Sequence, residues 1–98
     1  MFNNFTPYGN NYNQDFNTII TVVNEGMDIL RKSSTIRPVS FEMLQIWQKY
    51  ALTILKTVSY DQNILLEYTQ FLLTINNLSP YEQLSKSIEK LLDLARRI

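Results

Sequence analysis

Few side chains in this sequence have the types and spacing that metal binding or catalysis requires. Glu25 and Asp28 lie three residues apart, as two carboxylates of a dinuclear metal site do on a helix. The chain has no His and no Cys, so the usual partner of such carboxylates and every thiolate ligand are missing. We therefore predict no metal site and no cofactor, and we interpret the Glu25–Asp28 pair as a solvated helix face.

Other catalytic patterns are also missing from the chain. The two glycines, Gly9 and Gly26, form no phosphate-binding loop, and no Ser or Thr stands in a motif with a general base. We expect a non-catalytic protein with no catalytic residue and no small-molecule substrate. One alternative stays open, a small enzyme that uses a carboxylate or lysine whose pKa is shifted by burial.

Nucleic-acid binding is a second alternative, in which Gln62 and Asn63 near a helix start would read bases. Nine Lys and Arg balance nine Asp and Glu, and no cation lies between Lys56 and Lys86. Neutralisation of phosphates provides much of the affinity for nucleic acid, so a recognition helix without cations is a poor candidate. We therefore favour protein over nucleic acid as the partner.

Apolar residues recur at helical spacing through most of the chain and indicate an all-α protein without a sheet. Leu, Ile, Val and Phe make up roughly a third of the residues, which is typical of a chain that folds. We predict a small antiparallel bundle of three or four helices over residues 15–98, with helices at about 15–32, 41–58, 60–76 and 80–97. A non-helical arm over residues 1–14 precedes it, because Pro7 and Gly9 interrupt regular structure.

The first predicted helix carries an apolar row and an unusual glycine. Gly26 costs roughly 1 kcal/mol relative to Ala in a helix interior, so we expect a neighbouring helix to approach closely there. Ser40 and Ser79 are the predicted N-caps of later helices, and Pro80 and Glu82 complete the second signal. The row of the first helix consists of Phe16, Ile19, Ile20, Val23, Met27 and Leu30.

Residues 41–76 allow two interpretations. Two series with a spacing of seven run through them and keep one phase, which favours a single helix. The polar stretch 59–63 and the charge of Asp61 favour a break, with Ser59 as an N-cap and Gln62 completing a capping box. We lean slightly towards the break. The series are Leu44, Ala51, Val58, Leu65 and Leu72, and Trp47, Ile54, Asp61, Tyr68 and Ile75.

Surplus apolar side chains in the same segment are the strongest functional signal. A helix that is apolar on two or three sides is either central in a bundle or part of an interface. For a third row we weigh a place in the core against contact with another subunit or a partner. A second row holds Met43, Tyr50, Ile64 and Phe71, and the third row holds Leu52, Leu66 and Leu73.

The arm is the other candidate contact. It is uncharged and rich in Asn, and it carries the aromatic residues Phe2, Phe5, Tyr8 and Tyr12. It is either a free tail or a strap that docks on this chain, on another copy or on a target, since aromatic side chains offer a large contact area.

These features favour a non-catalytic protein-binding or assembly protein that acts through apolar helix faces and the aromatic arm. It would work as a homo-oligomer, or as an inhibitor or adaptor of another protein, of the kind that phages and plasmids encode. No stretch has the roughly 20 apolar residues of a membrane span, and residues 1–14 lack the features of a signal peptide. We expect a cytoplasmic location, in the host if the protein is viral, and no membrane contact.

Overall fold

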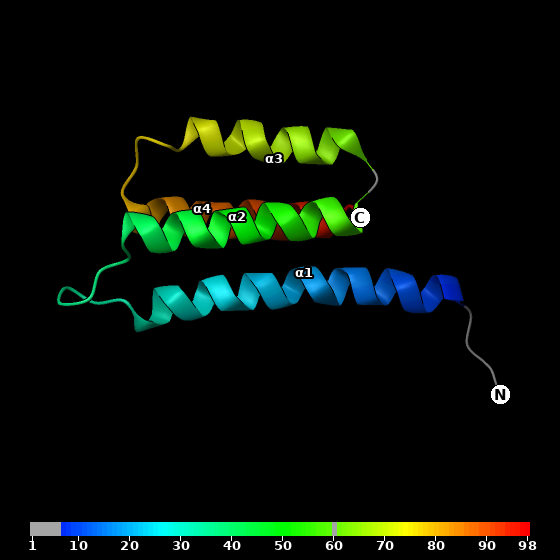
Figure 1. Cartoon of the computed structure of the whole chain (residues 1–98), viewed down its shortest axis with the longest axis horizontal. Helices are drawn as coiled ribbons and strands as arrows, with labels where there is room; N and C mark the ends of the chain where they lie inside the picture. Colours follow the sequence, from blue (N-terminus) through cyan, green and yellow to red (C-terminus); the bar gives the residue numbers. More distant parts are fainter. Residues whose placement is uncertain (1–6, 60) are drawn as a thin grey trace.

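Four helices in up-down-up-down order make up the computed structural model, which describes residues 7–59 and 61–98, with side chains from residue 15 onward (Figure 1). They are α1 (Pro7–Lys32), α2 (Phe41–Val58), α3 (Gln62–Thr74) and α4 (Pro80–Ala95). No strand occurs in this part of the chain. The all-α antiparallel bundle predicted from the apolar spacing is confirmed.

Helices α2 and α4 form the centre of the bundle. Each of them packs against the other three helices, whereas α1 and α3 lie on opposite sides of the central pair and, over the described residues, do not pack against each other. Figure 1 shows α3 above and α1 below the two overlapping central helices. Among the described residues, each outer helix therefore has two helical neighbours, α2 and α4.

The core lies mainly between α1, α2 and α4. Trp47 belongs to it, and its indole Nε1 donates a hydrogen bond of 2.9 Å to the main-chain carbonyl of Val22. A buried indole N–H needs an acceptor, so this bond fixes how α2 lies along α1. The largest fully buried aliphatic side chains are Ile19, Val22, Leu44, Leu55, Leu84, Leu91 and Leu94.

Helix α1 begins earlier than the sequence indicated. It starts at Pro7 rather than near Asp15, so the predicted non-helical arm is corrected to helix for residues 7–14, while residues 1–6 lie outside the described part. Proline suits the first helical turn, because the N–H that it lacks would have no partner within the helix there. Pro7 therefore starts α1 instead of interrupting it, and Gly9 is tolerated at a cost in helix propensity.

The buried row of α1 is also displaced from the predicted one. Val22 lies at its centre and is fully buried, whereas Phe16 and Met27 are exposed, so their predicted place in the core is wrong. Helix α1 packs against two helices, α4 and α2, so the residues it buries need not follow the single predicted row. The prediction for Gly26 is confirmed, since a Cβ there would lie 2.8 Å from Cδ1 of Ile88 and 2.8 Å from Cε2 of Trp47.

The chain breaks between α2 and α3, which excludes one continuous helix over residues 41–76. Asp61 is the N-cap of α3, and its Oδ1 accepts a hydrogen bond of 2.9 Å from the N–H of Asn63. Ser59 instead ends α2, and its Oγ accepts from the N–H of Asp61 at 3.2 Å. The predicted Ser59–Gln62 capping box is therefore wrong. A carboxylate suits the positive end of a helix, and Asp61 fills that role.

The other helix starts follow the sequence signals. Ser40 caps α2 by accepting from the N–H of Met43 at 3.0 Å. Ser79 caps α4, where its Oγ accepts from the N–H of Glu82 at 3.2 Å and donates to the Glu82 carboxylate at 3.1 Å. Both predicted caps are confirmed, and Pro80 occupies the first turn of α4. The last two helices each end two residues short of the expected 76 and 97.

Candidate functional site

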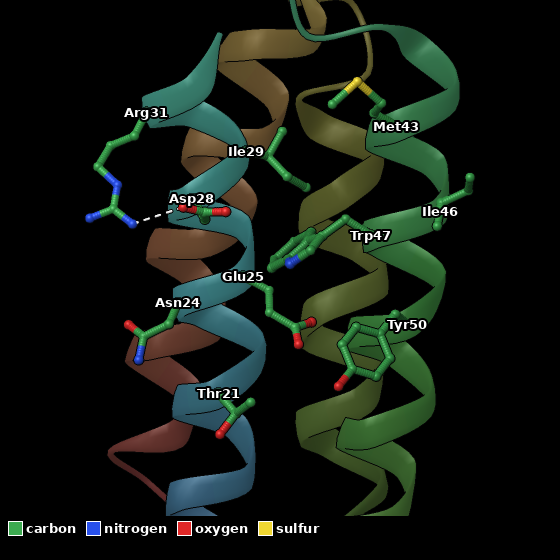
Figure 2. A pocket seen from close by; sticks show the side chains of 10 residues that line it. All are labelled: Thr21, Asn24, Glu25, Asp28, Ile29, Arg31, Met43, Ile46, Trp47 and Tyr50. Atoms are coloured by element: carbon green, nitrogen blue, oxygen red, sulfur yellow. Dashed lines mark hydrogen bonds and ion pairs between the residues drawn. The ribbon is translucent and has the colours of Figure 1, made fainter.

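An open groove of about 780 Å³ runs between α1 and α2 on the outside of the bundle (Figure 2). It exists because both helices turn their core rows towards the interior, which leaves the outer edges of the pair uncovered by α3 or α4. Four lining residues belong to α2, namely Met43, Ile46, Trp47 and Tyr50, and six belong to α1, namely Thr21, Asn24, Glu25, Asp28, Ile29 and Arg31.

The α2 side of the groove is apolar. Met43, Ile46 and Tyr50 follow one another three and four residues apart along one edge of the helix, and they are 41%, 64% and 37% exposed. Trp47 lies between them in sequence and is buried, with its ring turned towards α1 (Figure 2). The partly buried Ile29 completes the apolar lining from α1. The hydrogen bond between Trp47 and Val22 holds this lining in place.

The α1 side of the groove is polar and carries two carboxylates. Lys32 Nζ lies 2.9 Å and Arg31 Nη2 3.0 Å from the carboxylate oxygens of Asp28, and both contacts hold the pKa of Asp28 below its ordinary value. Glu25 makes no side-chain hydrogen bond or ion pair with any residue in the described part of the chain. Figure 2 shows its carboxylate reaching from α1 towards α2, whereas Arg31 points away from the groove.

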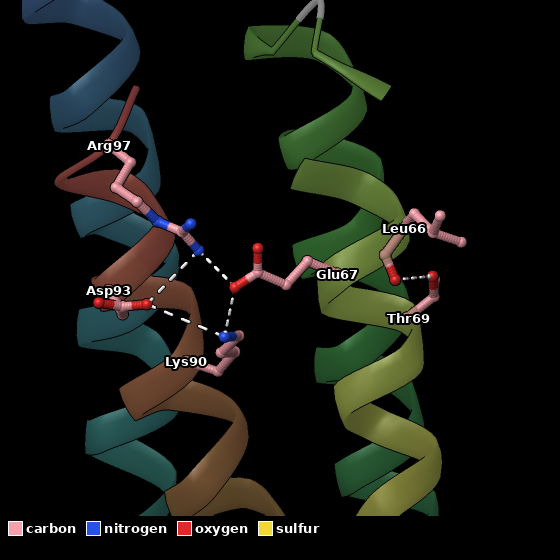
Figure 3. Close-up of polar contacts among 6 residues, drawn as sticks. All are labelled: Leu66, Glu67, Thr69, Lys90, Asp93 and Arg97. Atoms are coloured by element: carbon pink, nitrogen blue, oxygen red, sulfur yellow. Dashed lines mark hydrogen bonds and ion pairs between the residues drawn. The ribbon is translucent and has the colours of Figure 1, made fainter. Parts of the chain in front are cut away.

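The predicted third row is divided between core and surface. Leu52 is partly buried and packs against the core, whereas Leu66 and Leu73 are 54% and 70% exposed on α3. Figure 3 shows Leu66 pointing away from α4. The structure thus places Leu66 and Leu73, seven residues apart, on an outer face of α3 and keeps Leu52 largely out of solvent.

The four aromatic side chains of the predicted arm lie outside the part of the chain whose side chains the structure describes. Phe2 and Phe5 lie outside the described residues, and so do the side chains of Tyr8 and Tyr12, whose backbone belongs to α1. Their contact with a partner stays a prediction.

Ile46 is the groove residue that the sequence patterns missed. It belongs to none of the predicted rows, although it follows Met43 by three residues and precedes Tyr50 by four. That helical spacing was the available signal. Of the predicted second row, Met43 and Tyr50 line the groove, whereas Ile64 is buried and Phe71 partly so.

A second polar cluster joins α3 to α4 (Figure 3). Glu67 Oε2 accepts from Arg97 Nη2 and, at 2.6 Å, from Lys90 Nζ, and Asp93 lies 3.6 Å from Arg97 Nη2. The hydrogen bonds from Arg97 and Lys90 lower the pKa of Glu67 to about 2. Lys90 Nζ also lies 5.6 Å from the centre of the Phe71 ring. Glu67 lies on α3, whereas Lys90 lies on α4 and Arg97 follows its end, so these ion pairs attach α3 to α4.

The buried carboxylate that an enzyme could use does not occur in the described part of the chain, where the carboxylates with shifted pKa, Asp28 and Glu67, are ion-paired near the surface. The partly buried Lys90 is likewise paired with Glu67. Tyr68 is fully buried, its hydroxyl has no hydrogen-bond partner among those residues, and burial raises its pKa. The same residues include no group of three His, Cys, Asp or Glu that could hold a metal ion.

Comparison with protein-family models, with curated proteins and with solved structures gave no match. Over the described residues, none of the four helices is sufficiently long and apolar to span a bilayer. Among the described residues, the groove between α1 and α2 and the exposed leucines of α3 are the candidate contact surfaces.

Proposed function

We propose that this protein is a non-catalytic protein-binding module that takes a helical segment of a partner into the groove between α1 and α2. The observation that carries the proposal is the exposed row of Met43, Ile46 and Tyr50 beside the fixed ring of Trp47. An amphipathic helix that enters such a groove places its own side chains at intervals of three, four and seven residues against it.

The free energy for binding would come from removing this row from water. Full burial of a large apolar side chain contributes about 1.5–3 kcal/mol, and Ile46 is the most exposed of the three. The partner must supply matching apolar side chains, because the lining on α1 is polar apart from Ile29. The groove is open and its apolar row extends from Met43 to Tyr50 on α2, which suits a helix better than a small molecule, since small ligands are usually enclosed.

The charges around the groove support a protein rather than a nucleic acid as the partner. Arg31 and Lys32 are the nearest cations on α1, and both bind Asp28 of their own helix. Glu25 adds an anion to the lining. Arg37 lines an adjoining pocket with Asp28, and it forms no ion pair with another described residue. A phosphate backbone would thus meet one uncompensated cation at the end of the groove, whereas binding of nucleic acid depends on several cations that are free to contact phosphates.

The wider expectations from the sequence belong to the same proposal. Leu66 and Leu73 offer a second apolar surface on which self-association could depend, so the module acts as a homo-oligomer or as an adaptor or inhibitor of another protein. A cytoplasmic location and a phage or plasmid origin remain part of the proposal.

Trp47 is the only tryptophan of the chain and lines the groove, so its fluorescence reports on binding there. The test titrates the protein with an 18-residue amphipathic peptide that carries leucines at helical spacing and no tryptophan. We expect a saturable change in emission, lost or at least tenfold weaker in Ile46→Lys and retained in the matched variant Leu73→Lys. Both substitutions alter exposed side chains, so both variants should fold. No change with the unsubstituted protein, or a loss confined to Leu73→Lys, would contradict the groove as the binding site.

A further inference from the structure

We infer that the segment which fits this groove is a cationic amphipathic helix that places one Lys or Arg against Glu25. This inference rests on the proposed function and names the chemistry of the occupant. It follows from how charge is distributed along the groove, where one carboxylate is compensated and the other is not.

The two carboxylates of α1 differ in their surroundings. Asp28 is bound by Lys32 and Arg31 at 2.9 and 3.0 Å, so its charge is already satisfied within the helix. Glu25 lies one turn earlier and has no cation within ion-pair distance among the described residues. Its side chain reaches towards the apolar residues of α2 (Figure 2). An uncompensated anion therefore stands at the edge of an apolar surface.

A bound helix would remove Glu25 from water. The free-energy cost of that step depends on the charge that the bound helix carries. A purely apolar helix would leave the carboxylate desolvated and unpaired, which costs free energy. An acidic helix would add repulsion. A helix with Lys or Arg next to its apolar side chains would pair with Glu25, and the part-exposed ring of Tyr50 in the same lining offers a surface to the apolar stem of that side chain.

A second copy of this chain is a weaker candidate for the groove. Its most exposed helical leucine, Leu73, lies on α3, where no Lys or Arg occurs between Lys56 and Lys86. Insertion of that face would bury leucines but would leave Glu25 without a cation. The apolar row from Met43 to Tyr50 covers about two helical turns, so a partner helix of roughly three to four turns is sufficient.

The experiment compares three 18-residue peptides that differ at one position beside the apolar row, where they carry Lys, Gln or Glu. Each is titrated into the full chain, into Glu25→Gln and into the control Glu89→Gln, which removes an exposed carboxylate of α4. We expect the Lys peptide to bind the full chain and Glu89→Gln roughly two- to tenfold more tightly than the Gln peptide. The difference should disappear in Glu25→Gln and shrink with added salt.

The outcomes separate this inference from the proposed function. Equal binding of all three peptides, lost in Ile46→Lys, would keep the groove as a protein-binding site and overturn the cationic partner. Absence of binding by any peptide would overturn both. Sedimentation that shows a dimer of the full chain, dissociated by Ile46→Lys, would identify a second copy as the occupant and would also overturn the cationic partner.

Discussion

Three helices converge on Gly26, where a side chain would collide with Ile88 of α4 and Trp47 of α2. Trp47 cannot move away easily, because its indole is bonded to Val22 and buried. Gly26 therefore lowers the helix propensity of α1, but it permits the close packing that holds Trp47, a lining residue of the groove, in place.

Gly26→Ala should destabilise the protein. Overpacking costs typically about 1–3 kcal/mol and the gain in helix propensity is about 1 kcal/mol, so we expect the free energy of unfolding in urea to fall by roughly 1 kcal/mol. Asn17→Ala, at an exposed position of α1, is the control and should be neutral or stabilising. Equal or greater stability of Gly26→Ala would show that α2 and α4 have room at this point.

Tyr68→Phe tests the buried hydroxyl that has no partner in the described part of the chain. Removing it should leave the free energy of unfolding unchanged or raise it by up to about 1 kcal/mol, because the folded state no longer keeps a desolvated hydroxyl. Burial raises the pKa of Tyr68 from its ordinary value of 10.0. Above pH 10 the unfolded chain releases the Tyr68 proton more readily than the folded protein does, so the free energy of unfolding falls as the pH rises. The Phe variant has no such proton and should lose less stability in alkali.

The measurement is urea unfolding at neutral pH and above pH 10, with Tyr81→Phe, at an exposed position, as the control. A loss of more than about 1 kcal/mol in Tyr68→Phe would indicate a strong hydrogen bond to the hydroxyl.

For individual residues, the sequence allowed a correct prediction where the residue type at that position has one physical explanation. The cost of glycine in a helix predicted the close approach at Gly26, and the spacing of seven predicted Tyr68 in the core. Ile46 and Leu66 are equally apolar by type, and only the packing of the helices decides which neighbours cover them. The exposure of Ile46 therefore could not be predicted from the chain alone, and for Leu66 the sequence left core and surface open.

At the scale of the elements, the junction between α2 and α3 depends on Asp61. Its side chain accepts from the N–H of Asn63, and its own N–H donates to Ser59 Oγ. Capping by Asp61 thus outweighs the seven-residue apolar spacing, which continues through the junction unchanged. The sequence slightly favoured a break over one continuous helix but assigned the cap to Ser59, because Ser59 and Asp61, two residues apart, offered competing capping signals.

Asp61→Ala should lower the free energy of unfolding by about 1 kcal/mol, the usual cost of losing an N-cap. The conservative variant Asp61→Asn keeps an acceptor and should retain most of the stability. Chemical denaturation followed by circular dichroism gives both values. A rise in stability for Asp61→Ala would indicate that α2 and α3 join into one helix when the charge is removed.

Glu67→Gln should weaken the attachment of α3 to α4. Arg97 and Lys90 hold the pKa of Glu67 near 2, below its ordinary value of 4.5. A lowered folded-state pKa stabilises the protein above the unfolded-state value, and this contribution is lost as the pH falls from about 4.5 towards about 2. The variant should therefore melt at a lower temperature than the unsubstituted protein at neutral pH.

The difference in melting temperature should vanish near pH 2, where Glu67 is itself being protonated. Glu89→Gln serves as the control and should show little difference at either pH. A Glu67→Gln variant that melts like the unsubstituted protein at neutral pH would show that this exposed cluster contributes no stability, as many surface ion pairs do.

At the scale of the whole molecule, the groove is a consequence of how the four helices are arranged. Helices α2 and α4 take the centre, so the outer edges of α1 and α2 are left uncovered. The apolar rows predicted a bundle, because each row must be buried against another helix. They did not predict which helices take the centre, since that depends on contacts between residues far apart in the chain.

The central claim is that partners bind in the groove between α1 and α2, and nuclear magnetic resonance of the full chain tests it most directly. The Lys-bearing amphipathic peptide is added while the methyl resonances of Ile29, Met43 and Ile46 and the indole of Trp47 are followed. We predict saturable shifts of these resonances, with those of Leu66 and Leu73 unchanged. Shifts confined to Leu66 and Leu73, or no shift at any exposed methyl group, would contradict the claim.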